Sequence, residues 1–407
     1  MSAKRNFRAL VTRRAGSRFF NTLTQQYVNI YMVELGLRES DVGLVNSTST
    51  IVAVLPTTLL SFMADVKSRK IAYLIGLFLE MLSPLIYFID GNLSILVLAA
   101  SFSTIAFFGS SRVENILVAD SVRGRERGFA FSVINSISTL VAIFSPVIAA
   151  YIINYMGGLS AEGIRPLFLI QFIGLALVSL PALLFIQDVR PLGETSLLNS
   201  IKDSIEIIKL NPWLRKWILV EVLGGYVFSI SMPFQMIYAA RVKHANEFII
   251  GYMGLAFNIG NIVSSPLIGK LADKIGRVKT IVILRPLFYS SLLLLILAPS
   301  PEYLILAWLL RGIFFSSVSP FQALSLELVP YEYRGRWSAI RVLLSMLFRS
   351  PAPYLGGILY TMVAPETPFI LAVIVDLFLR LPLIASMPET LNRREYLSKF
   401  KSPNSKR

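Results

Sequence analysis

The chain of 407 residues contains no cysteine, a single histidine and few charged residues, which make up 15% of the total. Without cysteine no disulfide can form, and the sequence gives no indication of its redox compartment. The single histidine, His244, excludes a histidine-rich metal cluster. A soluble protein contains about 25% charged residues, so the deficit indicates that lipid is the solvent for most of this chain.

Motifs of enzymes and of ATP-driven proteins are also missing. The sequence has no G-x-x-x-x-G-K-[ST] stretch, no H-E-x-x-H motif, no histidine pair and no convincing serine dyad. We therefore expect a protein that is not an enzyme, does not use ATP directly, and has no cofactor or bound metal.

Long apolar runs fill most of the sequence. Hydrophobic residues make up 55% of the chain, its mean hydropathy is +0.64, and apolar windows of about 20 residues recur that could each cross a bilayer as a helix. The alternating stretches of about ten residues that form membrane barrels are absent. The sequence predicts an all-α membrane protein. Its twelve expected spans lie near residues 17–36, 42–64, 71–90, 94–117, 129–155, 166–187, 213–239, 249–270, 279–298, 303–326, 338–361 and 367–387.

Positive charge lies almost wholly on one side of the predicted bilayer. The two ends and the even-numbered connections hold thirty Lys and Arg residues, whereas the odd-numbered connections hold only Arg38, Arg165, Arg241 and Lys243. Because Lys and Arg collect in cytoplasmic segments, both termini are predicted to lie in the cytoplasm of a multi-pass protein of the cell (plasma) membrane. The net charge of +15 then reflects topology and attraction to anionic lipid headgroups, and nucleic acid is not an expected partner.

The longest predicted cytoplasmic connection, residues 188–212, divides the chain into two halves. Its apolar residues recur at helical spacing opposite charged ones, which predicts an amphipathic helix on the membrane surface or in a solvated linker. The basic N-terminal stretch resembles a signal peptide, but the first span has full membrane length and no evident cleavage site, so we expect it to be retained. The predicted organisation is a basic tail at 1–16, a six-helix half at 17–187, the linker, a six-helix half at 213–387 and a basic tail at 388–407.

The two halves repeat each other in sequence. The equivalent pairs are Asp65 and Asp273, and Arg69 and Arg277, at a shift of 208 residues, and Asp120 and Glu327, Arg127 and Arg334, and Pro146 and Pro353, at a shift of 207. An internal repeat across two six-span halves is typical of transporters that expose a midplane binding site alternately to either side.

The stretches around these charges resemble the loop signatures of the major facilitator superfamily. The match is close for GKLADKIGRVK at 269–279 and weaker for SFMADVKSRK at 61–70, which has Ser61 and Ser68 where glycine is usual. RGFA at 127–130 and RGRWSA at 334–339 match a second element of the family. The resemblance covers residues 15–390 and implies the superfamily's fold, with twelve helices in two pseudo-symmetric six-helix halves.

The charged loops form the first candidate site. An acid ends span 2 or 8, an arginine follows four residues later, and a further acid ends span 4 or 10, so the charges can cluster at a partly dry interface. Such charges cost several kcal/mol each unless paired, so a cluster that opens in one conformation can act as a latch; the resemblance implies a cytoplasmic latch of the outward-open state. Chain orientation alone is the alternative explanation. The candidate gating residues are Asp65, Arg69, Asp120, Arg127, Asp273, Arg277, Glu327 and Arg334.

Two prolines predict kinks at equivalent places. Pro146 in span 5 and Pro353 in span 11 each precede a pair of small residues by one turn, and such residues let helices approach closely. The element resembles the proline–glycine element of drug exporters in this superfamily, but span 5 has Ala149 and Ala150 instead, which argues against an exporter.

Ionisable residues inside the spans form the second candidate site, because each costs about 2.5–3.5 kcal/mol at the bilayer centre. The resemblance implies a cavity lined by spans 1, 4, 7 and 10, with help from 2, 5, 8 and 11. Arg311 and Arg349 are expected to face substrate or counter-ion, with Glu221 and Glu114 as partners or proton carriers; a static Arg–Glu pair is the alternative. The further candidates are Arg112, Gln26, Asn29, Gln235 and Gln322.

Other charges in the spans are expected to be structural. Asp376 and Arg380, four residues apart in span 12, predict a mutual ion pair. Glu80 and Arg285 lie in spans 3 and 9, which support the cavity from outside, so we expect packing partners or lipid-side anchors. The arginine that exporters of this superfamily carry in span 4 is missing here.

The sequence thus predicts a secondary active transporter that moves a small molecule by alternating access, coupled to protons. Cavity arginines favour an organic anion or other metabolite as substrate. A multidrug proton antiporter is the alternative, and a non-transporting membrane sensor is a third possibility. The expected partners are the substrate, protons and the lipid bilayer, and we expect a monomer.

Overall fold

The computed structural model describes residues 2–89, 91–122, 127–187, 206, 208, 211–330 and 333–391. Within these residues the regular structure is helical and contains no strand, as expected where backbone groups in lipid must satisfy one another. The first helices are α1 (Ser2–Gln25), α2 (Val28–Glu34), α3 (Glu39–Val66), α4 (Arg69–Ile89), α5 (Leu93–Ile105), the π-helix η1 (Ala106–Ser110), α6 (Ser111–Asp120), α7 (Arg127–Ala142), α8 (Ser145–Tyr155) and α9 (Ala161–Phe185). The amphipathic helix predicted in the linker falls largely outside the described residues.

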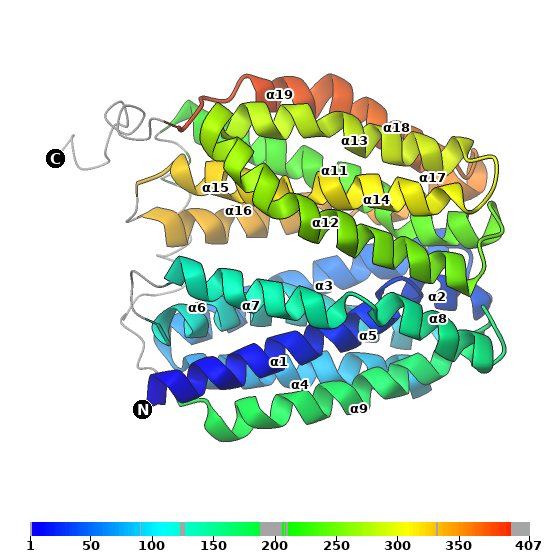
Figure 1. The fold of residues 1–407 in the computed structure, drawn as a ribbon, viewed down its shortest axis with the longest axis horizontal. Helices are drawn as coiled ribbons and strands as arrows, with labels where there is room; N and C mark the ends of the chain where they lie inside the picture. The colour runs from blue at the N-terminus through cyan, green and yellow to red at the C-terminus, as the bar shows by residue number, and fades with distance from the viewer. Residues whose placement is uncertain are drawn as a thin grey trace. The chain divides into compact units, whose positions relative to one another are not determined.

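The remaining helices follow that linker (Figure 1). They are α11 (Pro212–Arg241), α12 (Glu247–Ile275), α13 (Arg277–Leu297), α14 (Tyr303–Phe315), α15 (Val318–Glu327), α16 (Arg334–Arg349), α17 (Ala352–Met362), α18 (Thr367–Val375), the π-helix η4 (Asp376–Arg380) and α19 (Leu381–Ala385).

Eleven helical segments among the described residues are long and apolar enough to cross a membrane, and they match the predicted spans 2 to 12. The first predicted span covers the end of α1 and all of α2, which are separated at Gln26 and Tyr27. α1 begins at Ser2, so residues 2–16 of the predicted basic tail at 1–16 are helical and continuous with the span. The prediction of an all-α, multi-pass membrane protein is confirmed.

The helix bounds reproduce the repeat found in the sequence. α4 and α13 are related by a shift of 208 residues at both their first and last residues. α7 and α16 are related by 207 residues at both ends, and so are α8 and α17. The two halves therefore share a helix pattern that extends well beyond the charged loops.

Both prolines of spans 5 and 11 follow a break in the helix. α7 ends at Ala142 and α8 begins at Ser145, one residue before Pro146. In the same way, α16 ends at Arg349 and α17 begins at Ala352, one residue before Pro353. The breaks fall where a proline ring would clash with the preceding turn. The small residues one turn later are buried in both spans, which fits the predicted close approach of neighbouring helices.

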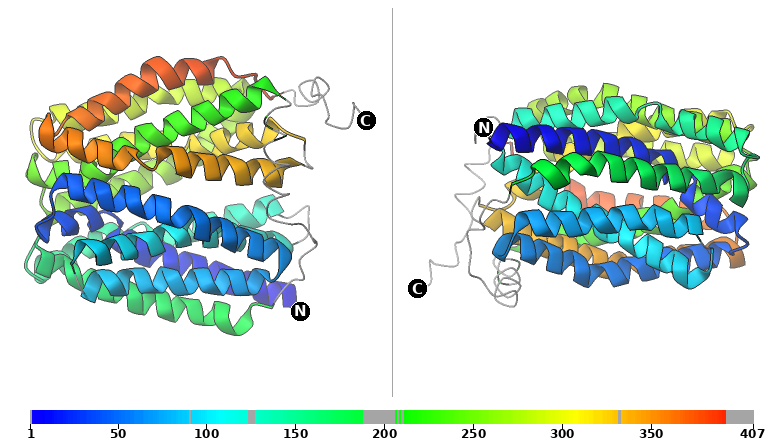
Figure 2. Two further views of the ribbon diagram at one scale, coloured as in Figure 1. Left: turned by 180° about the vertical axis from the view of Figure 1, so that it is seen from behind. Right: turned by 90° about the horizontal axis from the view of Figure 1, so that it is seen from below.

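The chain packs as two compact units, the first of residues 1–194 and 233–255 and the second of residues 195–232 and 256–407. In the first unit, α9 packs against α1 and α4, and α1 also packs against α7 (Figures 1 and 2). Its apolar core includes Leu10, Tyr73 and Leu117. In the second unit, α13 packs against α14 and α15, and the core includes Trp217 and Trp337.

Residues 233–255 pack with the first unit, although the sequence assigned them to the second half. In the first unit, Arg241 Nη2 lies 3.0 Å from Glu34 Oε1, and the Tyr27 hydroxyl donates to the Glu247 carbonyl at 3.2 Å. A Cβ atom at Gly251 would lie 2.9 Å from the carbonyl oxygen of Pro146. Close backbone contact and this ion pair explain why packing divides the chain differently from the predicted boundary at 212–213.

Candidate functional site

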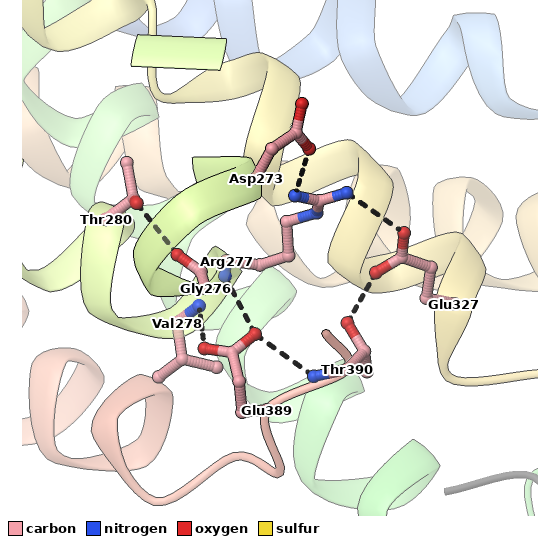
Figure 3. Close-up of polar contacts among 8 residues, drawn as sticks. All are labelled: Asp273, Gly276, Arg277, Val278, Thr280, Glu327, Glu389 and Thr390. Carbon is pink, nitrogen blue, oxygen red and sulfur yellow. Dashed lines mark hydrogen bonds and ion pairs between the residues drawn. The ribbon is translucent and has the colours of Figure 1, made fainter. Parts of the chain in front are cut away.

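The first candidate site is built around Arg277 at the start of α13 (Figure 3). Its Nη1 atom lies 2.6 Å from Asp273 Oδ1, one turn earlier, and its Nη2 atom lies 3.5 Å from Glu327 Oε1 at the end of α15. The Asp273 side chain is 72% exposed, whereas those of Arg277 and Glu327 are 17% and 19% exposed. Exposed ion pairs contribute little to stability. The less exposed Arg277–Glu327 contact, which joins α13 to α15, is therefore expected to contribute more than the Arg277–Asp273 contact, which joins α13 to α12.

A third acid, Glu389, completes this cluster after α19. Its carboxylate accepts hydrogen bonds from the backbone N–H groups of Arg277 at 2.7 Å and Val278 at 3.0 Å. Thr390 donates its hydroxyl to Glu327 (Figure 3). A carboxylate at a helix N-terminus satisfies unpaired N–H groups and interacts favourably with the helix dipole. We call Asp273, Arg277, Glu327, Glu389 and Thr390 the α13 cluster.

Gly276 allows Glu389 to reach the start of α13. Its φ of +106° lies in the left-handed region, which glycine adopts without steric cost. A Cβ atom there would also lie 2.2 Å from Glu389 Oε2. The equivalent Ser68 has no positive φ, and its hydroxyl accepts a hydrogen bond from the Ile71 N–H at 3.0 Å. The serine in the weaker signature thus caps α4 itself.

The first unit contains the counterpart of the α13 cluster. Arg69, at the start of α4, forms an ion pair with Asp120, at the end of α6. Asp65 lies within electrostatic reach of Arg112 and Arg69. Both repeats therefore bring the predicted arginine to the acid that ends the neighbouring span. Arg127 and Arg334 begin α7 and α16, and the side chain of Arg127 lies outside the described residues.

The second candidate site centres on Glu221 in α11. Arg341 Nη1 lies 2.5 Å from Glu221 Oε1, and Arg341 Nη2 donates to Gln322 Oε1 at 3.0 Å. Trp217 Nε1 also donates to Glu221 Oε1, at 3.2 Å. At about 1.5 Å per residue, Glu221, Gln322 and Arg341 lie roughly 8–14 Å from the ends of their helices. We call Trp217, Glu221, Gln322 and Arg341 the Glu221 cluster.

Arg341 was not predicted as a site residue. Its place near the start of span 11 assigned it to the orienting charges of the loop, but it lies inside α16 and is only 6% exposed. The sequence did hold one signal, because Arg341 and the predicted Arg349 are eight residues apart and so lie close to one face of the same helix.

The two arginines expected to face substrate differ in their surroundings. Arg349 is partly buried, lies within electrostatic reach of Glu221 and packs over Gly225, where a Cβ atom would meet its side chain at 2.9 Å. Arg311 is 5% exposed, and its guanidinium lies over the rings of Trp308 and Phe288, at 5.0 and 5.9 Å from the centroids. Because these rings hold it inside the second unit, we leave Arg311 out of the proposed substrate site.

Two of the candidates in the first unit, Glu114 and Asn29, contact polar partners nearby. Glu114 is buried, and Arg14 Nε lies 3.7 Å from its Oε1 atom. Asn29 accepts a long hydrogen bond from Asn46, at 3.4 Å. Gln26 lies at the break between α1 and α2 and is partly exposed. Gln235 is buried, at 4% exposure.

A third charged cluster, in the second unit, matches the structural expectations for spans 9 and 12. Asp376 is fully buried, and its Oδ1 atom lies 3.0 Å from Arg285 Nη1 and 3.1 Å from Arg380 Nη1. Tyr289 donates its hydroxyl to Asp376 Oδ2 at 2.9 Å. The expected Asp376–Arg380 pair is present, and Arg285 joins it as a packing partner. Arg380 Nε also donates to the Val220 carbonyl at 3.0 Å, beside Glu221.

Glu80 likewise has a packing partner. Arg13 of α1 forms an ion pair with it, and the Asn21 side chain donates to its Oε1 atom at 2.8 Å. The side chains of Arg13 and Glu80 are 3% and 14% exposed. One basic residue of the predicted N-terminal tail is thus buried between α1 and α4.

Membrane helices repeated in two halves, with an ion-pair cluster at the same loop of each half, are typical of multi-pass transporters built from an internal repeat. The family model described as Major Facilitator Superfamily matches residues 15–244 and 218–395. The chain belongs to this family.

Comparisons with individual proteins are consistent with this family assignment. Multidrug resistance protein MdtG of Dickeya zeae (strain Ech586) is 24% identical over 288 residues, which are 68% of this chain and 68% of that protein. MdtG of Rahnella sp. (strain Y9602) is 24% identical over 371 residues, 88% of this chain and 87% of its own length. Among solved structures, a mutant of the nucleoside transporter NupG has a TM-score of 0.75 at 16% identity and covers 93% of this chain and 99% of its own. A D-xylose–proton symporter has a TM-score of 0.71 at 16% identity, with 94% and 98% covered. These two structures share the fold.

Proposed function

We propose that this protein is a proton-coupled secondary transporter that moves small amphiphilic organic anions by alternating access. The observation that carries this proposal is the charge of the Glu221 cluster. Arg341 and Arg349, both on α16, lie near a single carboxylate, that of Glu221. Among the described residues, these two guanidinium groups share that carboxylate at a site that three spans expected to line the cavity build together. Two guanidinium groups around one carboxylate favour a substrate with a negative group.

Export is the direction that the relatives favour. The MdtG proteins named above are called multidrug resistance proteins, at 24% identity. Two features separate this chain from the exporter pattern: Ala100 and Ser101 occupy the region of the expected span-4 arginine, and Ala149 and Ala150 follow Pro146. We therefore propose a narrower, anionic substrate class. Proton antiport of cationic drugs is the second candidate function, and it rests on those relatives.

Glu221 is the proposed proton carrier. A carboxylate can move a proton only if water reaches it, and the Glu221 side chain is 15% exposed. Glu114, the other candidate, is 7% exposed and pairs with Arg14. The cationic groups that face Glu221 are Arg341 and Arg349 of α16, and Arg380 donates a hydrogen bond to the carbonyl of the adjacent Val220. A proton on Glu221 would release Arg341 for an incoming anion.

The α13 cluster and its counterpart at Arg69 are the proposed latches. We place both termini on the cytoplasmic side of the cell membrane, so both clusters lie at the cytoplasmic ends of the spans. There they close the cytoplasmic side of the transporter in the outward-open state. Asp65 and Asp273, Arg69 and Arg277, Asp120 and Glu327, and Arg127 and Arg334 keep the gating roles predicted for them. The predicted six-helix halves, as a monomer, are the proposed moving bodies.

The test is a flux assay with the purified protein in proteoliposomes under an imposed pH gradient. A panel of aromatic carboxylates, sulfonates and cationic dyes separates the candidates. We expect the gradient to drive the anions, and expect collapse of the gradient with a proton ionophore to abolish that flux. Flux of cationic dyes alone would favour the second candidate function. No flux of any compound, with ligand binding that triggers a partner protein, would favour the membrane sensor.

A further inference from the structure

The guanidinium of Arg341 is divided between a charged and a neutral acceptor. Nη1 lies 2.5 Å from Glu221 Oε1, and Nη2 donates to Gln322 Oε1 at 3.0 Å. Arg341 is only 6% exposed, so removal of its charged partner would leave a poorly hydrated cation. Buried guanidinium groups keep an anionic partner because an unpaired charge costs several kcal/mol. An anion that replaced Glu221 would meet the same requirement.

The Glu221–Arg341 pair is buried on the arginine side and partly open to solvent on the carboxylate side. The Glu221 side chain is 15% exposed, and Gln322 is exposed. The pair around Asp376 differs, because that carboxylate is fully buried and accepts hydrogen bonds from Arg285, Arg380 and Tyr289. An external anion can therefore compete for the position of the Glu221 carboxylate more readily than for that of Asp376, which is 0% exposed.

A second cationic side chain lies near Glu221. Arg349, eight residues after Arg341 on α16, lies within its electrostatic reach. A carboxylate displaced from Arg341 thus stays near a positive charge, and this lowers the cost of exchange.

We propose that Arg341 binds the anionic group of the substrate and that Glu221 is the resident carboxylate which that group displaces. This inference rests on the proposed function and names the substrate contact within it. The best fit is a planar carboxylate, which can accept two parallel hydrogen bonds from a guanidinium. During the exchange, Gln322 remains beside Arg341 and Trp217 remains beside Glu221.

Chemical rescue tests the exchange without knowledge of the natural substrate. Glu221→Gln removes the resident carboxylate, and benzoate is the probe that can replace it. The full chain is purified in detergent, and its apparent thermal midpoint is followed by intrinsic tryptophan fluorescence, because the chain has four tryptophans and no cysteine for thiol dyes. We expect saturating benzoate, but not benzamide, to raise the midpoint of Glu221→Gln by about 3 °C. The double variant Glu221→Gln/Arg341→Gln should show no such rise.

Glu80→Gln is the matched control. It breaks another Arg–Glu pair, with side-chain exposures of 3% and 14% against 6% and 15% for Arg341 and Glu221. Asn21 also donates a hydrogen bond to Glu80, and the pair does not belong to the proposed anion site. Equal rescue of both single variants, or of the double variant, would overturn the proposal, because benzoate would then act on any broken pair.

A second measurement covers the case in which Glu221→Gln does not fold. Trp217 donates a hydrogen bond to Glu221, so displacement of that carboxylate should change its emission. In the wild-type chain we expect benzoate, and not benzamide, to change tryptophan emission, and expect Trp217→Phe and Arg341→Gln each to abolish the change. An unaltered response in Arg341→Gln would contradict the proposal. Rescue without flux would refute transport but keep the anion site; flux without rescue would keep transport and place the anion elsewhere.

Discussion

Glu389 closes the start of α13 by accepting a hydrogen bond from the backbone N–H of Arg277 at 2.7 Å, more than a hundred residues along the chain. Arg277 in turn holds Asp273 and Glu327 through its guanidinium. The segment after the last span is thereby linked to the same helix end as the proposed latch. The α13 cluster thus joins four segments: the end of α12, the start of α13, the end of α15 and the residues that follow α19.

Glu389→Gln should weaken this cap. A neutral amide loses the attraction to the helix dipole and can accept less strongly, so we expect a loss of about 0.3–1 kcal/mol in the free energy of unfolding. The apparent thermal midpoint in detergent measures it. Glu302→Gln is the control, because Glu302 is an exposed acid hydrogen-bonded to Ser300, and the substitution should change stability by less than about 0.5 kcal/mol. Equal effects of the two substitutions would argue against a capping role.

Gly276→Ser should destabilise the folded protein far more than the reciprocal substitution at the equivalent position, Ser68→Gly. A serine at 276 would be strained at a φ of +106° and would collide with Glu389, so we expect a loss of about 1–3 kcal/mol. Ser68→Gly loses a cap worth a few tenths of a kcal/mol and introduces no clash. Comparison of the two thermal midpoints checks the prediction. Similar midpoints would mean that the two loops are equivalent in spite of their different backbones.

Asp376→Asn should be the most destabilising of these substitutions. It removes the carboxylate that two buried arginines share, and loss of one partner from a buried ion pair costs about 3–5 kcal/mol. Tyr289→Phe removes one hydrogen bond to the same carboxylate and should cost about 0.5–1.5 kcal/mol. Expression level and thermal midpoint measure both. A mild effect of Asp376→Asn would show that water or another acceptor compensates the arginines.

The sequence predicted helices well and contacts between helices less well. Apolar windows and the 207- and 208-residue shifts depend only on local composition and on the repeat, and the helix bounds of α4 and α13 follow them closely. Arg341 looked like a loop charge because a window average cannot tell whether a residue near a span end points to water or to Glu221. Glu389 lay too far along the chain from α13 for any motif to connect them. Asp376 and Arg380 were predictable because one helix turn joins them.

The absence of cysteine makes the orientation of the chain directly testable. Lys67→Cys and Lys274→Cys place single thiols at exposed positions in the two signature loops. If both loops are cytoplasmic, neither thiol should react with an impermeant maleimide in intact cells and both should react in inverted vesicles. Glu302→Cys, exposed in an odd-numbered connection, should show the opposite pattern. Reaction of residues 67 and 274 from opposite sides would remove the basis for two equivalent latches.

Alternating access to the Glu221 cluster is the central claim, and one labelling measurement tests it most directly. Gln322→Cys places a single thiol at an exposed position beside Arg341. An impermeant maleimide should reach this thiol from either side of the membrane, at rates that an imposed pH gradient shifts in opposite directions. Reaction from one side only, at a rate that the gradient leaves unchanged, would contradict the account.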